Sequence, residues 1–210
     1  MGFSGFPAAA FDFYTGLCAD NSKAYWTAHK DTYESAVRAP MAELFAELAP
    51  EFGAGRLARP YRDMRFSKAA SPYKTRQYGF TETGCFLSLD AGGLTVAGGM
   101  YAPAAEQLAR YRAAVDAAGP GGRLTAIIDD LVAGGFEIGG DRLKTRPRGV
   151  PADHPRLELL RHRALIAYMN WSDEPWLHTP EARDKVAAAW RALRPILTWV
   201  DDHVGRAVQE

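Results

Sequence analysis

The sequence has little of what would mark a secreted, membrane-bound or metal-binding protein. Its only cysteines, Cys18 and Cys85, are too few for a disulfide framework and form no CxxC pair, which predicts free thiols in a reducing cytosol. No stretch approaches the ~18 uncharged apolar residues of a membrane span. The N-terminus has no basic region, and Asp12 interrupts its apolar run, so a signal peptide is not expected. We therefore expect a cytoplasmic protein without a membrane-bound segment.

The chain also lacks an excess of charge and the common cofactor motifs. Lys plus Arg number 25 and Asp plus Glu number 25, whereas proteins that coat duplex nucleic acid usually carry a basic excess. No two of the five histidines have the i, i+4 spacing of a helical metal site, and the glycine pairs fit neither a phosphate loop nor a dinucleotide fingerprint. We expect no metal, no cofactor and no duplex nucleic acid, and any basic surface is restricted to a local patch.

The chain does have the apolar content of a folded domain. With 210 residues and 47% hydrophobic residues, it is expected to form a single domain over residues 1–210. Hydrophobic periodicity, Pro and Gly predict helices at 7–18, 21–40, 41–53, 103–119, 123–134, 153–161 and 179–205, and strands or hairpins at 59–67, 84–102, 136–147 and 164–171. Either Asn21 or Ser22 would cap the second helix. This pattern predicts an α+β fold, with a mostly antiparallel sheet of short strands packed by N-terminal, central and C-terminal helices.

Two basic segments stand out in this balanced sequence. Five cations occur between residues 62 and 76, against the single acid Asp63, and a second group follows at 144–148. If 143–148 is extended, its three cations point the same way because alternate positions share a face. Arg forks match carboxylate or phosphate geometry, and Lys adds a mobile point charge. A converging pair of segments would make a pocket for an anion of two or more charges, with candidate ligands Arg62, Arg65, Lys68, Lys74, Lys144, Arg146 and Arg148.

Other residues near these segments carry possible further roles. Asp63 would orient the arginines, and His154 is the candidate for proton transfer, with a helix-start role as the alternative. Tyr73 lies between the cations and would stack on a ligand ring, with hydrogen bonding by its hydroxyl group as the alternative. If the protein is an enzyme, metal-independent phosphate- or carboxylate-ester chemistry fits these groups. The alternative is a non-catalytic interaction module that docks an acidic partner and holds the basic residues in structural ion pairs. Oligomeric state leaves no signal in the sequence.

Three stretches carry a resemblance to a known family. The segments are RDMRFSKAASPYKT, GGMYAPAAEQLARYR and LKTRPRGVPADHPRLELLRHRAL. They resemble the bacterial and fungal domain of unknown function 2461 family, and the resemblance extends over about residues 3–203. It implies one domain over most of the chain and supplies no established activity. The family commonly has Asp-Lys where this chain has Ala69-Ala70, so one cation and one carboxylate of its pattern are missing here.

Overall fold

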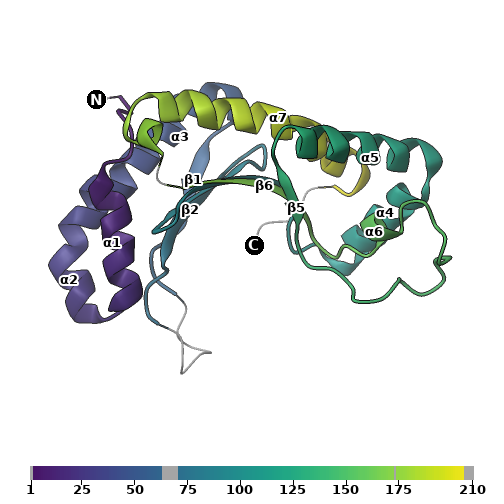
Figure 1. Ribbon diagram of the computed structural model, residues 1–210, viewed down its shortest axis with the longest axis horizontal. Coiled ribbons are helices and arrows are strands. Elements are labelled where there is room, and N and C mark those ends of the chain that lie inside the picture. The colour runs from purple at the N-terminus through teal and green to yellow at the C-terminus, as the bar shows by residue number, and fades with distance from the viewer. Residues whose placement is uncertain (1, 63–70, 173, 206–210) are drawn as a thin grey trace. The chain divides into compact units, whose positions relative to one another are not determined.

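Helices are the first and last elements of the described chain, and short strands and further helices lie between them (Figure 1). The computed structural model describes residues 2–62, 71–172 and 174–205. The α-helices are α1 (Ala8–Ala19), α2 (Lys23–Thr32), α3 (Ala39–Phe52), α4 (Ala105–Asp116), α5 (Ala118–Ala133), α6 (Leu157–Leu160) and α7 (Glu181–His203). Two irregular helices complete the set: the π-helical η1 (Tyr33–Arg38) and the 3-10 helix η2 (Pro175–His178).

The strands form one six-stranded sheet in the order β1-β2-β3-β4-β6-β5. The pairs β1–β2, β2–β3 and β5–β6 are antiparallel. The expected α+β class is therefore confirmed, with helices in the N-terminal, central and C-terminal parts of the chain. The strand bounds are β1 (Gly55–Leu57), β2 (Arg76–Thr81), β3 (Phe86–Asp90), β4 (Gly93–Met100), β5 (Glu137–Gly139) and β6 (Leu165–Trp171).

The chain divides into two compact units. Unit 1 holds residues 1–96 and 170–189, and unit 2 holds residues 97–169 and 190–210. Strands β4 and β6 and helix α7 each contribute residues to both units. The expected single domain over residues 1–210 stays a prediction.

In unit 1, local sequence signals set the helix ends. Pro7 precedes α1, as expected, and Ser22 rather than Asn21 caps α2, because the Ser22 side chain accepts a hydrogen bond from the Tyr25 backbone N–H at 3.1 Å. The chain stays helical from α2 through η1 into α3. Pro40 cannot donate a backbone hydrogen bond, and its ring crowds the preceding turn; the π-helical stretch immediately before it is the kind of irregularity that accommodates such a residue.

The helices of unit 1 pack against one face of β2 and β3. The Tyr33 hydroxyl of η1 donates to Gln77 Oε1 at 2.6 Å, and Gln77 Nε2 donates to the Ala58 carbonyl at 2.9 Å. Gly79, two residues further along β2, lies directly against Phe45 of α3. Since alternate strand residues share a face, Gln77 and Gly79 define the helix-covered side of these strands.

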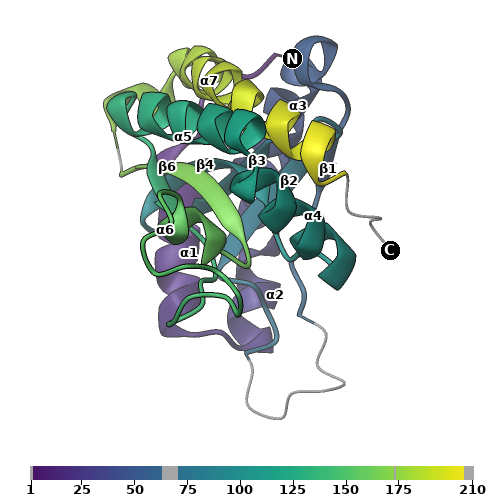
Figure 2. The same cartoon turned by 90° about the vertical axis from the view of Figure 1, so that its right-hand side faces the viewer.

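In unit 2, α5 lies beside the C-terminal part of α7 (Figures 1 and 2). The Trp199 indole N–H donates to the Pro120 carbonyl at 2.9 Å, which ties the start of α5 to α7. In the part of α7 that belongs to this unit, the expected apolar stripe is buried at Trp190, Leu193 and Val200, and Leu197 is half-buried; Val204, just past the helix end, is also buried. Val186, the first residue of the stripe, is buried in unit 1.

The hairpin expected around residues 91–93 connects β3 to β4 and depends on one glycine. Gly93 has φ +129°, and a Cβ there would clash with the Trp171 carbonyl oxygen. Both the backbone angle and the close approach exclude a side chain at this position.

We predict that Gly93→Ala lowers the free energy of unfolding by at least about 2 kcal/mol, because strain and a backbone clash add. Gly122→Ala is the control: Gly122 lies inside α5 with nothing near its Cβ position, so this change should stabilise by about 1 kcal/mol. Urea denaturation of the two variants measures both values. Equal effects of the two substitutions would contradict the account of this turn.

Candidate functional site: two braced basic segments

The described residues at the two ends of the first basic segment are paired with each other. Arg62 N–H donates to the Pro72 carbonyl at 2.9 Å, Lys74 N–H donates to the Pro60 carbonyl at 2.8 Å, and Tyr61 forms an antiparallel bridge with Tyr73. The two ends of the segment are therefore held side by side as a short ladder in unit 1. The expected strand over residues 59–67 is present in the described part only as the Tyr61 bridge.

Asn21 and a group of aromatic rings hold these paired ends in place. The Asn21 amide makes two hydrogen bonds with the Tyr73 backbone: Nδ2 donates to the carbonyl at 3.1 Å, and Oδ1 accepts from the N–H at 3.0 Å. The Tyr73 ring stacks on Trp26 with ring centroids 4.5 Å apart and planes 8° apart, while the Tyr61 ring beside them is 52% exposed. Tyr73 is thus buried in core packing, and its contact with a ligand stays a prediction.

The candidate ligands of this segment fall partly within the described residues. Arg62 is exposed, and Lys74 is half-buried, with Nζ donating to the Tyr78 hydroxyl at 3.2 Å and lying 4.8 Å from the Tyr78 ring centroid. The remaining candidates, and the two residues at which the chain departs from the family pattern, lie outside the described residues: Asp63, Arg65, Lys68, Ala69 and Ala70.

The second basic segment is a loop and not a strand. Of the strand pair expected over 136–147, the structure has β5 and the isolated bridge at Arg142, so the prediction is wrong for the part that holds the cations. After the bridge at Arg142 the backbone bends, and Val150 N–H donates to the Pro147 carbonyl at 3.2 Å to close a turn that contains Gly149 at φ +85°. Proline and a left-handed glycine are both incompatible with a continuing strand. The alternate-face argument for the three cations therefore does not apply, although Lys144, Arg146 and Arg148 are all exposed.

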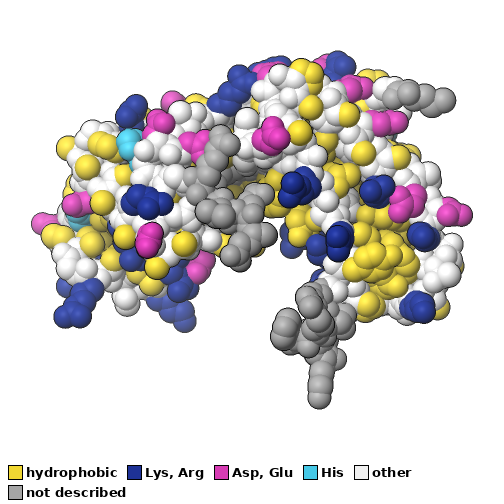
Figure 3. Space-filling view, turned by 180° about the vertical axis from the view of Figure 1, so that it is seen from behind, with side chains coloured by type: hydrophobic (Ala, Val, Ile, Leu, Met, Phe, Trp, Pro, Cys, Tyr) yellow, Lys and Arg dark blue, Asp and Glu magenta, His cyan; other side chains and the backbone are white. Residues whose placement is uncertain are grey.

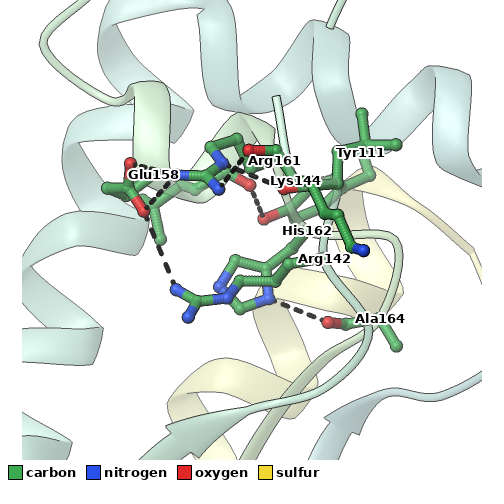
Figure 4. A network of polar contacts seen from close by, with 9 residues as sticks. Tyr111, Arg142, Lys144, Glu158, Arg161, His162 and Ala164 are labelled. Carbon is green, nitrogen blue, oxygen red and sulfur yellow. Dashed lines mark hydrogen bonds and ion pairs between the residues drawn. The ribbon is translucent and has the colours of Figure 1, made fainter. Parts of the chain in front are cut away.

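Arg161 braces this loop through its guanidinium group (Figure 4). Its Nε donates to the Leu143 carbonyl at 3.0 Å, and its Nη2 donates to the Lys144 carbonyl at 2.8 Å. Its Nη1 donates to Glu158 Oε1 at 2.9 Å, so the carboxylate holds the fork in position. In the other direction, Leu143 N–H donates to the Arg161 carbonyl at 2.8 Å. The start of the loop is therefore fixed by hydrogen bonds that use none of its own cationic groups.

The acids nearest the second segment are already paired with other arginines. Asp141 Oδ2 lies 2.7 Å from Arg163 Nη2, and Glu158 contacts both Arg161 and Arg142. The loop at 143–148 carries three cations, Lys144, Arg146 and Arg148. Within the described ranges, their side chains form no ion pair and no hydrogen bond.

His162 lies buried beside this network. Its Nδ1 donates to the Ala164 carbonyl at 2.9 Å, which places the proton of the neutral ring on Nδ1. Burial lowers the pKa of His162 below its usual range; the hydrogen bond to Ala164 and the carboxylate of Glu158 oppose this, and the positive charges of Arg142 and Arg161 add to it.

His154 lies in a different set of contacts. The Arg156 backbone N–H donates to His154 Nδ1 at 3.0 Å, so the neutral ring carries its proton on Nε2 and donates it to Asp116 Oδ1 at 3.0 Å. Arg156 itself donates to the Val115 and Asp116 carbonyls. Both ring nitrogens thus hold the loop before α6 against the end of α4. The proton-transfer role of His154 stays a prediction, and so does the role of Asp63.

The structure places the two segments in different units, and their convergence into one pocket stays a prediction. Unit 1 holds Arg62, Tyr73 and Lys74, and unit 2 holds the loop cations and His154. Figure 3 shows Lys and Arg side chains at several separate places on one face, mixed with acids, as the balanced composition leads one to expect.

Sequence reasoning missed the residues that hold the two loops. Asn21 was considered only as a helix cap, and Arg161, Glu158 and His162 were not considered as site residues. The one available signal was the RHR tripeptide at 161–163, which follows a predicted short helix. Nothing in the sequence pairs Asn21 with Tyr73, which is 52 positions away.

Searches for metal and membrane features returned none in the part of the chain that the structure describes. Among these residues, no group of three or more His, Cys, Asp or Glu side chains is arranged to hold a metal ion. None of the described helices combines the length and the apolar character that crossing a bilayer requires. Cys18 is exposed and Cys85 is buried, and both are in the thiol form.

The fold and the two segments define the class of protein: it is an α+β protein with two basic segments, and a different set of hydrogen bonds holds the backbone of each. The chain belongs to the family of conserved hypothetical proteins DUF2461, whose family model matches residues 9–199. This confirms the resemblance found in the sequence. A search of curated proteins gave no match.

We predict that Arg161→Lys loosens the second loop, because an ammonium group cannot reach two carbonyls and a carboxylate with fork geometry. Hydrogen exchange at the Leu143 amide should accelerate at least about tenfold, and the free energy of unfolding should fall by about 2 kcal/mol. Arg163→Lys is the control, since its pair with Asp141 is exposed and contributes at most about 1 kcal/mol. Unchanged exchange in Arg161→Lys would show that the loop is held by other contacts.

We predict that His162 makes stability fall in mild acid. The ring stays neutral in the native state, while in the unfolded chain it is protonated below about pH 6.5. Unfolding therefore takes up a proton, and the free energy of unfolding decreases as pH falls through that value until the lower native pKa is reached. His162→Asn, whose amide can replace the donor to Ala164, should lose this part of the pH dependence. Urea denaturation at pH 7.5 and 5.5 tests it, and identical pH dependence in both proteins would contradict it.

Proposed function

We propose that this protein binds a small phosphate- or carboxylate-bearing ligand of two or more charges through its two basic segments. The proposed ligands are Arg62, Arg65, Lys68 and Lys74 of the first segment and Lys144, Arg146 and Arg148 of the second. The observation that carries the proposal is the exposed, unpaired state of the three loop cations on a backbone that Arg161 holds in place.

The pairing of the neighbouring acids supports a ligand over structural ion pairs for this loop. Had the cations served only to stabilise the fold, Asp141 and Glu158 would be their natural partners, but these carboxylates contact Arg142, Arg161 and Arg163. Cations that are close in sequence repel one another, and a multivalent anion relieves that repulsion. Because the groups are exposed, salt should weaken the interaction.

The exposure of the same cations also favours a second candidate, the docking of an acidic segment of a partner protein. An extended acidic chain needs accessible cations and no concave pocket, and the loop at 144–148 offers them. A small anion and an acidic peptide are distinguished by which of the two the protein binds.

We predict that millimolar pyrophosphate or citrate raises the melting temperature of the full chain. At about ten times its Kd, a ligand adds roughly 1.4 kcal/mol of stability, or about 3–6 °C for a chain of this size. Arg146→Ala and Lys74→Ala should each reduce the shift by half or more. Arg123→Ala, a change at an exposed position on α5, should leave it intact.

The outcomes of this screen separate the candidates. No shift with any anion would overturn the proposal. A response to a glutamate-rich peptide alone would replace it with partner docking. Loss of the shift in only one of the two segment variants would restrict the site to that segment.

A further inference from the structure

The strands of unit 1 have a second face, opposite the one on which η1 contacts Gln77 and α3 contacts Gly79. Residues directly opposite in an antiparallel pair share a face, and the register places Arg76 opposite Asp90, Tyr78 opposite Ser88, and Phe80 opposite Phe86. Arg56 of β1 lies opposite Phe80. These residues alternate with Gln77 and Gly79, whose side is covered by η1 and α3. We call the group Arg56, Arg76, Tyr78, Phe80, Phe86, Ser88 and Asp90 the outer face.

Three aromatic rings lie together on the outer face. The ring centroids of Phe80 and Phe86 are 5.0 Å apart, and those of Tyr78 lie 5.9 Å from each of them. All three residues are half-buried. Ser88, opposite Tyr78, is 2% exposed, and no hydrogen-bond partner of its hydroxyl is found among the described residues. Half-buried aromatic rings on a sheet face are suited to stacking on a flat ring of a ligand.

Cations border these rings at both sides. Lys74 Nζ lies over the Tyr78 ring and bonds its hydroxyl, and Arg76 precedes Tyr78 by two positions, about 7 Å along the strand. Arg56 is exposed opposite Phe80. Asp90, although opposite Arg76, accepts from the Gly92 N–H at 2.8 Å. Among the described residues Arg76 forms no ion pair with it or with any other acid.

We infer that the outer face binds a mononucleotide, with the base stacked on Phe80 beside the nearly perpendicular Tyr78 ring and the phosphate held by Lys74 and Arg76. The inference rests on the proposed function and names its ligand class. Neither an inorganic anion nor a dicarboxylate would use the rings, whereas a nucleotide uses rings and cations together. Asp90 is placed to accept from ribose hydroxyls. The zero net charge favours a single nucleotide over a nucleic-acid polymer, which requires many phosphate contacts.

The test is a calorimetric titration of the full chain with adenosine and guanosine 5′-monophosphates, and separately with pyrophosphate and the free nucleosides. We expect a nucleotide to bind at least about tenfold more tightly than either part. Phe80→Leu should weaken nucleotide binding about tenfold, as loss of one stacking ring does, and leave pyrophosphate binding unchanged. Tyr101→Leu is the control, because that ring is 72% exposed elsewhere on the chain.

Each other outcome decides against the inference in a distinguishable way. If pyrophosphate binds as tightly as the nucleotides and Phe80→Leu changes nothing, anion binding stands and the nucleotide inference is overturned. If neither binds, both fail. If a ten-nucleotide single-stranded DNA binds tenfold more tightly than the mononucleotide, the face binds a nucleic-acid polymer. Should Phe80→Leu unfold, the aromatic proton resonances of the wild-type protein decide: stacking shifts those of Tyr78 and Phe80, and their constancy under saturating nucleotide excludes it.

Discussion

The described parts of the two basic segments depend on hydrogen bonds that other parts of the chain make to their backbones. In the loop at 143–148 Arg161 donates to the carbonyls of Leu143 and Lys144, and in the first segment Asn21 bonds both backbone groups of Tyr73. A loop rich in cations cannot hold itself together through those side chains, because like charges repel. Once its backbone polar groups are satisfied from outside, the cations need no structural partner.

Our proposal for the function rests on this arrangement. Each brace has its own support: Glu158 holds the Arg161 guanidinium, and the stack of Trp26 on Tyr73 holds the segment that Asn21 bonds. These contacts order the backbone of the two segments. In our proposal the charged ends of the Lys and Arg side chains then bind an anion. Charge-assisted hydrogen bonds to such an anion are stronger than neutral ones when the donors are already in position. On strand β2 the proposed ligand contacts include aromatic rings as well as cations.

Local features of the sequence predicted local features of the structure well, and long-range ones poorly. Pro7 and Ser22 start helices because capping acts within one turn, and the turn at Gly93 follows from a conformation that favours glycine. The sequence predicts a strand pair over 136–147, but the strand β5 ends at Gly139 and residues 143–148 form a loop. Its real conformation depends on Arg161, which lies 18 positions from Leu143. Such a contact leaves no periodic trace in one sequence.

The central proposal is that the cations of the braced segments bind a multivalent anion, and hydrogen exchange of the full chain with and without pyrophosphate tests it most directly. If the proposal holds, saturating pyrophosphate slows exchange in residues 142–150, in residues 71–76, or in both. Slowed exchange in one segment alone would restrict the site to that segment. Unchanged exchange in both would contradict the claim that these cations serve an anionic ligand.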